Sequence, residues 1–137
     1  MCDNHRDNTR ETEFPVRYAE TDAMGVVHHA NYLLYFEEGR SQYMRDLGSD
    51  YALVEASGYQ LPVTEATLRY VSSTRYGERV RIRTHIGKNR SRSVTFHYEV
   101  IDPKTGTILV TGCTHHVWTN ANGKVTRVPE SWRNLFS

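Results

Sequence analysis

The sequence predicts an α+β domain in which one long helix packs against an antiparallel sheet. Three observations lead to this class. Apolar residues follow helical spacing between Asn31 and Gly48, several stretches after Gly58 alternate apolar and polar residues, and turn sequences separate those stretches. The order is therefore one strand, one long helix and four further strands joined largely by hairpins. A length of 137 residues suits one domain of this kind.

The first expected strand covers residues 13–20, where Phe14, Val16 and Tyr18 alternate with polar residues. Ahead of it the chain is polar and lacks the apolar segment of a secretion signal. We therefore expect residues 1–11 to form a flexible N-terminal tail and residues 12–137 to form a single domain. No apolar run approaches the ~20 residues that a membrane-spanning helix needs, so no membrane span is expected.

The long helix is expected to begin at Asn31, a plausible N-cap, and to end at Gly48. Gly39 inside it costs ~1 kcal/mol relative to alanine, so we expect a strand to pass too close for a side chain. A shorter helix is expected over residues 49–57. The apolar stripe of the long helix consists mainly of Tyr32, Phe36, Tyr43 and Leu47, widened by Leu33 and Met44.

The strands that follow are expected over residues 60–71, 78–86, 93–101 and 107–119, with turns at 102–106 and 120–123. Pro129 or Glu130 is expected to begin a last helical turn. One helix cannot cover both faces of a five-stranded sheet. We therefore expect a second molecule to cover the far face, so that the protein is an oligomer.

Composition excludes several kinds of protein. The formal net charge is +1 with 24% charged residues, which gives no support for a nucleic-acid-binding or membrane-surface protein. Cys2 and Cys113 form no CxxC motif and no plausible disulfide framework, so a reducing compartment, the cytoplasm, is expected.

An acidic residue, a glycine and two histidines precede the helix in the segment TDAMGVVHHANY. Together with the order of elements over about residues 13–129, this segment resembles the hotdog-fold thioesterases, and most closely the 4-hydroxybenzoyl-CoA thioesterase branch with its Tol–Pal-associated members. The motif of that branch is matched by Asp22, Gly25, Val26, Val27 and Tyr32. The resemblance implies a hotdog fold, in which a five-stranded antiparallel sheet wraps round the long central helix.

The resemblance also implies an acyl-CoA thioesterase that releases a free acid and coenzyme A. Asp22 would act as general base or as nucleophile, and the sequence does not decide between these roles. The backbone N–H of His29 would polarise the thioester carbonyl, with the His29 imidazole as a further donor. Gly25 would let the loop bend, and the residues expected to contact substrate here are Gly25, Val27, Asn31 and Tyr32.

Coenzyme A carries phosphates, and the resemblance assigns its nucleotide end to Lys88, Arg90 and Arg92; a solvated basic turn is the alternative. A thioester on an acyl carrier protein is also compatible. No cofactor is expected, because coenzyme A is part of the substrate. The family resemblance further implies homodimers, often assembled into tetramers, with active sites at the dimer interface.

Two other functions stay open: a non-catalytic acyl-thioester-binding protein, and a hotdog dehydratase of 3-hydroxyacyl thioesters. The His-x-x-x-x-Pro context of such dehydratases is absent from the sequence. A metal site is not expected, because His115 and His116 are neighbours in a strand and point to opposite faces. His85 and His97 are expected to point outward. The acyl group itself is not predicted.

Overall fold

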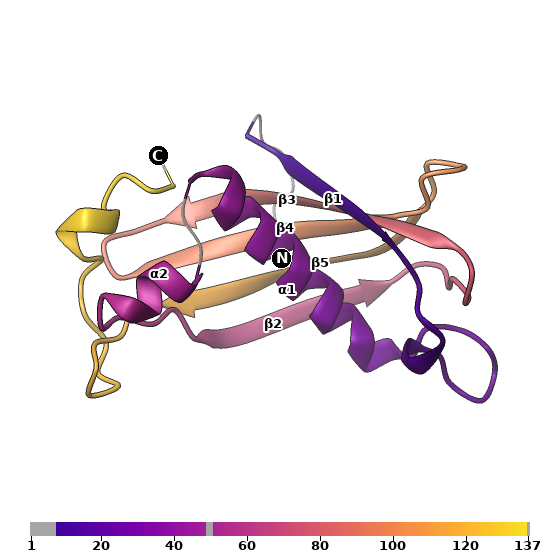
Figure 1. The fold of residues 1–137 in the computed structure, drawn as a ribbon, viewed down its shortest axis with the longest axis horizontal. Coiled ribbons are helices and arrows are strands. Elements are labelled where there is room, and N and C mark those ends of the chain that lie inside the picture. Colours follow the sequence, from indigo (N-terminus) through magenta and orange to yellow (C-terminus); the bar gives the residue numbers. More distant parts are fainter. Residues whose placement is uncertain (1–7, 49–50, 137) are drawn as a thin grey trace.

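One antiparallel sheet of five strands runs through the molecule, and the long helix α1 crosses one of its faces (Figure 1). The computed structural model describes residues 8–48 and 51–136. The strand order is β1-β3-β4-β5-β2, so β1 and β2 form the two edges. The strands are β1 (Arg10–Pro15), β2 (Val63–Tyr70), β3 (Arg79–Asn89), β4 (Ser93–Ile101) and β5 (Ile108–Val117). The helices are α1 (Tyr32–Asp46) and α2 (Tyr51–Ala56), with three-ten turns η1 (Tyr18–Glu20), η2 (His29–Asn31) and η3 (Glu130–Trp132).

These elements confirm the expected α+β class. No helix in the described ranges has both the length and the apolar character to cross a membrane.

The core lies between α1 and the sheet. Helix α1 buries Tyr32, Phe36, Tyr43 and Met44, which pack against inward residues of β3, β4 and β5 such as Phe96 and Tyr98. Gly39 confirms the close approach expected from the sequence: a Cβ there would lie 2.5 Å from Thr84 Oγ1 and 2.6 Å from Ile82 Cγ2. Leu33 differs from the expectation, because it lies off the buried stripe and is 41% exposed.

Strand β1 lies earlier in the chain than expected. It begins at Arg10, within the predicted tail of residues 1–11, and ends at Pro15, which has no N–H to continue a ladder. The chain then turns through η1, and Tyr18 is 76% exposed instead of lying on a strand face. Residues 1–7 and residues 49–50, the start of the expected shorter helix, lie outside the described residues.

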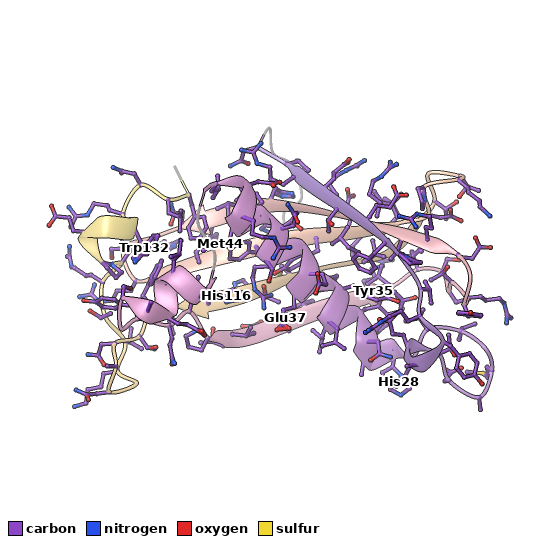
Figure 2. The ribbon with its side chains drawn as sticks, in the orientation of Figure 1. His28, Tyr35, Glu37, Met44, His116 and Trp132 are labelled. Atoms are coloured by element: carbon purple, nitrogen blue, oxygen red, sulfur yellow. The ribbon has the colours of Figure 1, made fainter. Side chains whose placement is uncertain are left out.

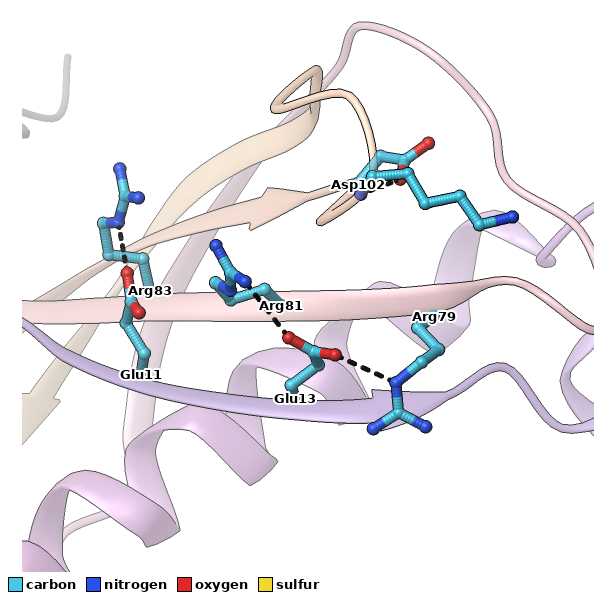
Figure 3. Close-up of polar contacts among 7 residues, drawn as sticks. Glu11, Glu13, Arg79, Arg81, Arg83 and Asp102 are labelled. Carbon is cyan, nitrogen blue, oxygen red and sulfur yellow. Dashed lines mark hydrogen bonds and ion pairs between the residues drawn. The ribbon is translucent and has the colours of Figure 1, made fainter.

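Alternating acidic and basic side chains join β1 to β3 on the face away from α1 (Figure 3). Glu13 contacts the guanidinium groups of Arg79 and Arg81 at 2.9 and 3.3 Å, and Glu11 contacts Arg83 at 3.0 Å. These groups are all partly exposed, so solvent screens each pair and its contribution to stability is small. Their main effect is to fix the register of β1 against β3.

The far face of the sheet is more covered than expected. His85 and His97 do lie on that face, but they are only 4% and 5% exposed, and their rings stack at 5.0 Å. Cys113 on the same face is disulfide-bonded. The expectation that the cysteines form no disulfide is therefore wrong, and the cysteine argument for a reducing compartment no longer holds.

Candidate active site

The segment between η1 and η2 folds as a small hairpin that presents Asp22. Thr21 and Val27 form an isolated bridge, Asp22 N–H donates to Val26 O at 2.8 Å, and Gly25 N–H donates to Asp22 O at 2.9 Å. Gly25 has φ +81°, a conformation that glycine adopts without strain. The loop therefore bends at Gly25, as the sequence predicted.

The Asp22 carboxylate takes part in its own turn. Oδ1 accepts hydrogen bonds from the backbone N–H groups of Met24 at 2.9 Å and Val26 at 3.4 Å. The side chain is half-buried, and no described group donates to Oδ2. The turn thus fixes one oxygen and leaves the other accessible to a substrate or a water molecule.

The helical entry is capped differently from the prediction. The His28 imidazole accepts from Ala30 N–H through Nδ1 at 3.2 Å and so caps η2. Asn31, the predicted N-cap, makes no capping bond; its Nδ2 donates instead to Glu20 O at 2.8 Å. Asn31 thus occupies the N-cap position of α1, as predicted, but its side chain does not cap the helix, because its amide donates to the Glu20 carbonyl.

Residue 29 offers an available backbone donor. His29 is the first residue of η2, and no described group accepts the hydrogen of its backbone N–H. Its carbonyl is held by Tyr70, whose hydroxyl donates to His29 O at 3.0 Å, and the Tyr70 ring meets the imidazole edge-on. The His28 and His29 rings stack at 4.2 Å (His28 is labelled in Figure 2). The first turn thus exposes a donor close to the hairpin that carries Asp22.

Other predicted site residues have mainly structural contacts in one chain. Val27 is buried in the core, and its N–H donates to Thr74 O at 3.0 Å. Tyr32 is also buried, and burial, followed by the neighbouring Tyr70, raises its pKa to about 12. Arg75 Nη1 donates to Met24 O at 3.3 Å and holds the hairpin tip. Within the chain, Val27 and Tyr32 therefore anchor the loop to the hydrophobic core.

Lys88, Arg90 and Arg92 are exposed at the turn between β3 and β4, at the opposite end of β3 from the Asp22 hairpin. Strand β3 is 11 residues long, so its two ends lie about 33 Å apart. Arg90 lines a hollow of about 320 Å³ with Arg127 and Arg133, which the sequence analysis missed. Val128 N–H donates to Ser91 O at 2.7 Å and brings this C-terminal segment to the turn.

Two larger hollows flank α1. One of about 560 Å³ lies between α1, α2 and the start of β2, and its lining includes Glu37, Arg40 and Val63. The other, of about 380 Å³, lies between β1 and α1 and includes Glu20 and Tyr35. Asp22 and His29 line neither hollow. In a single chain His29 is exposed and Asp22 is half-buried, and both lie outside these two hollows.

Comparisons with known proteins agree with this fold. The model of the thioesterase-like superfamily matches residues 16–136. The protein YneP of Bacillus subtilis (strain 168) is 35% identical over 105 residues, which are 77% of this chain and 75% of YneP. The acyl-CoA thioester hydrolase YbgC of Escherichia coli O157:H7 is 30% identical over 97 residues, which are 69% of this chain and 72% of YbgC.

Among solved structures, the DHNA-CoA thioesterase of Staphylococcus aureus superposes with a TM-score of 0.88 at 33% identity, covering 93% of this chain and 88% of that one. The hypothetical protein TT1821 of Thermus thermophilus gives 0.87 at 37% identity, covering 92% and 95%. With the family model spanning nearly the whole domain, the chain belongs to the thioesterase-like superfamily and is a thioester hydrolase with the hotdog fold.

Proposed function

We propose that the chain hydrolyses acyl-CoA thioesters, with Asp22 and the backbone N–H of His29 as the reacting pair. The observation that carries this proposal is the junction of hairpin and helix. There a half-buried carboxylate with one unoccupied oxygen and a backbone donor without an acceptor belong to the same short segment. Membership in the 4-hydroxybenzoyl-CoA thioesterase branch, with its Tol–Pal-associated members, is part of the same proposal, and it rests on the match of Asp22, Gly25, Val26, Val27 and Tyr32 to the motif of that branch.

The chemistry follows from these two groups. Either the Asp22 carboxylate attacks the thioester carbon, or it removes a proton from a water molecule that attacks. In both routes the carbonyl oxygen gains negative charge, and the His29 N–H stabilises it by a hydrogen bond. The carbon–sulfur bond then breaks, the thiolate leaves and is protonated as coenzyme A, and water ends as part of the free acid. An acyl enzyme at Asp22 occurs only in the first route.

The nucleotide end of coenzyme A is assigned to the basic hollow at the β3–β4 turn. Of the three basic residues that the resemblance implied, Arg90 lines this hollow, and Lys88 and Arg92 are exposed beside it. Arg127 and Arg133 add two guanidinium groups that form no ion pair within the described residues. Guanidinium groups suit phosphate because they donate two parallel hydrogen bonds. This hollow lies too far from Asp22 of the same chain to serve one substrate molecule there.

A homodimer brings the two regions together. The whole of β2 except Leu68 is exposed, and its outer edge has no strand partner in the described chain. Antiparallel pairing of β2 with its copy places the Val63 end of one strand beside the Tyr70 end of the other. The Val63 end adjoins the basic turn through β5 and β4, and Tyr70 contacts His29. Each active site is then built from two chains.

The sequence of β2 suits this pairing. With Thr67 on the two-fold axis, Glu65 lies opposite the partner's Arg69 and Val63 lies opposite the partner's Val71, and both contacts occur twice. Val63 and Val71 are 46% and 58% exposed in the single chain, so pairing would bury apolar surface. Association of two dimers into a tetramer stays a prediction, as does the cytoplasmic location, which lost its cysteine argument with the disulfide at Cys113.

The test is an assay of thiol release from a panel of acyl-CoAs with short aliphatic, medium-chain and hydroxylated aromatic acyl groups. We expect at least one member to release coenzyme A at a rate proportional to enzyme. Binding of these esters without thiol release from any of them would reject hydrolysis and favour a binding protein. The same panel on an acyl carrier protein shows whether coenzyme A is the preferred carrier.

A further inference from the structure

Glu20 is a buried acidic residue just ahead of the Asp22 hairpin, and its carboxylate is fully occupied. The residue is 7% exposed. Oε1 accepts from the backbone N–H of Arg17 and from the Tyr35 hydroxyl, both at 2.9 Å, and Oε2 accepts from Arg17 Nε at 3.0 Å. Glu20 thus connects Arg17, which follows β1, to Tyr35 in the first turn of α1.

The carbonyl of the same residue holds the helical entry. Glu20 O accepts from His28 N–H at 2.9 Å and from Asn31 Nδ2 at 2.8 Å. Residues 28 and 31 lie on either side of His29, and Figure 2 shows His28 and Tyr35 at the same end of α1. We call Arg17, Glu20, His28, Asn31 and Tyr35 the Glu20 cluster. It ties the start of the hairpin, two residues before Asp22, to the turn that carries the His29 donor.

The cluster works with an ionised Glu20. Burial by itself would raise the pKa of Glu20, but the hydrogen bonds from Arg17 N–H, Tyr35 and the Arg17 side chain outweigh it and hold the pKa below its ordinary value. Burial and the Glu20 charge raise the pKa of Tyr35, so Tyr35 stays a donor at neutral pH. Both oxygens of Glu20 already accept hydrogen bonds, which makes the residue a poor proton acceptor for a substrate.

We infer that Glu20 is a positioning residue whose carboxylate sets the relative placement of Asp22 and the His29 N–H. The inference rests on the proposed function, because it assigns Glu20 a role in that same reaction. A displacement of about 1 Å between reacting groups costs on the order of 10²-fold in rate. Loss of the carboxylate therefore acts on the chemical step, while the parts of the substrate that provide binding keep their contacts.

The test is the variant Glu20→Gln, which keeps the size of the side chain but replaces one acceptor oxygen by an NH₂ group facing the donors of Arg17. We expect kcat to fall about 10- to 100-fold, with KM within about twofold. The matched control is Glu13→Gln, which likewise removes a carboxylate paired with arginine. Glu13 contacts Arg79 and Arg81 and lies on β1, away from the hairpin. The control is expected to keep both constants.

A second variant and a second readout cover the case in which Glu20→Gln folds poorly. Tyr35→Phe removes only the hydroxyl bond and keeps the ring contact with Phe14, and we expect a fall in kcat of about threefold at unchanged KM. Hydrogen exchange of the His28 amide reports the cluster without any substrate. We expect it to quicken about tenfold in Glu20→Gln, while the Val128 amide is unchanged.

The outcomes separate the two proposals. A folded Glu20→Gln with unchanged kcat overturns the positioning role. The same holds if the variant melts at a lower temperature but keeps its kcat when assayed well below that melting temperature. If the wild-type chain releases no thiol from any ester, the proposed function fails. In that case hydrogen exchange of the His28 amide alone tests the inference. An exchange rate in Glu20→Gln equal to that of the wild type overturns the inference, and faster exchange supports the placement of the loop by Glu20.

Discussion

Asp22 serves its own turn and offers an unoccupied oxygen, so a substitution can separate these two roles. Asn at position 22 keeps an Oδ1 that accepts from Met24 and Val26, and the hairpin is therefore retained. What is lost is the negative charge needed to attack the thioester or to deprotonate water. The structural and the chemical interpretation of Asp22 thus make different predictions for the same variant.

We predict that Asp22→Asn lowers kcat by about 10²- to 10⁴-fold, which is the usual contribution of a positioned base. Thiol release at saturating acyl-CoA measures this effect. Circular dichroism and sedimentation are expected to match the wild type, which checks the retained fold. Turnover equal to that of the wild type would remove Asp22 from the mechanism.

Buried polar groups also join several elements beneath α1. Arg40 donates to Tyr98 Oη at 3.0 Å, Tyr98 Oη contacts Thr114 Oγ1 at 2.6 Å, and Thr114 Oγ1 contacts His116 Nε2 at 2.7 Å. His116 Nδ1 lies 2.9 Å from Leu61 O, which can only accept, so Nδ1 carries the hydrogen. Nε2 is then an acceptor, and the whole chain of hydrogen bonds runs in one direction while His116 is neutral.

This arrangement predicts a loss of stability in mild acid. Burial lowers the pKa of His116 to about 4, with the bond to Leu61 opposing part of the effect. Since the unfolded histidine titrates near 6.5, the stabilisation is complete above about pH 6.5 and is lost as the pH falls towards 4, by up to ~3 kcal/mol. Urea unfolding between pH 7 and 5, above the carboxyl range, measures it. In His116→Gln we expect the free energy of unfolding to depend less on pH, whereas the control His115→Gln is expected to keep the pH dependence of the wild type. If the free energy of unfolding fell equally with pH in the wild type and both variants, this assignment to His116 would be refuted.

The elements show what local sequence could and could not predict. Helix α1 and the strands from β2 to β5 follow from periodicity and turn residues that lie within short windows, whereas the roles expected of Asp22 and His29 came from the resemblance of a short motif to a known family. The cap at His28 did not follow, because its competitor Asn31 is drawn away by Glu20, eleven residues earlier. The bond of Tyr70 to His29 spans forty-one positions. Arg127 and Arg90 line the same hollow, where the hydrogen bond from Val128 to Ser91 holds the C-terminal segment against the β3–β4 turn. Contacts of that range depend on tertiary packing, which no local pattern encodes.

At the scale of the whole molecule, the distance between the basic hollow and Asp22 makes substrate length a probe. We predict that Arg127→Gln raises KM for an acyl-CoA by about 3- to 10-fold and leaves KM unchanged for the same acyl group on N-acetylcysteamine, which lacks the nucleotide. Lys104→Gln, at an exposed turn elsewhere, is the control. Equal changes for both esters would mean that Arg127 does not contact the nucleotide.

The assembly has its own test. We predict that the wild type sediments as a dimer or larger at micromolar concentration, and that Thr67→Glu shifts it towards monomer and abolishes turnover, because two like charges meet at the two-fold axis. Thr67→Ser keeps the size and polarity and is expected to behave as the wild type. A fully active monomer, of either the wild type or Thr67→Glu, would contradict an active site shared by two chains.

The ladder of acidic and basic residues between β1 and β3 limits how far such a sheet grows. Its charged side chains are already engaged within the chain, and Pro15 ends the strand, so this border is a poor template for another strand. In the proposed dimer, pairing through β2 would use the other edge strand of each copy. We therefore expect the sheet to end at two chains and not to extend into a fibre.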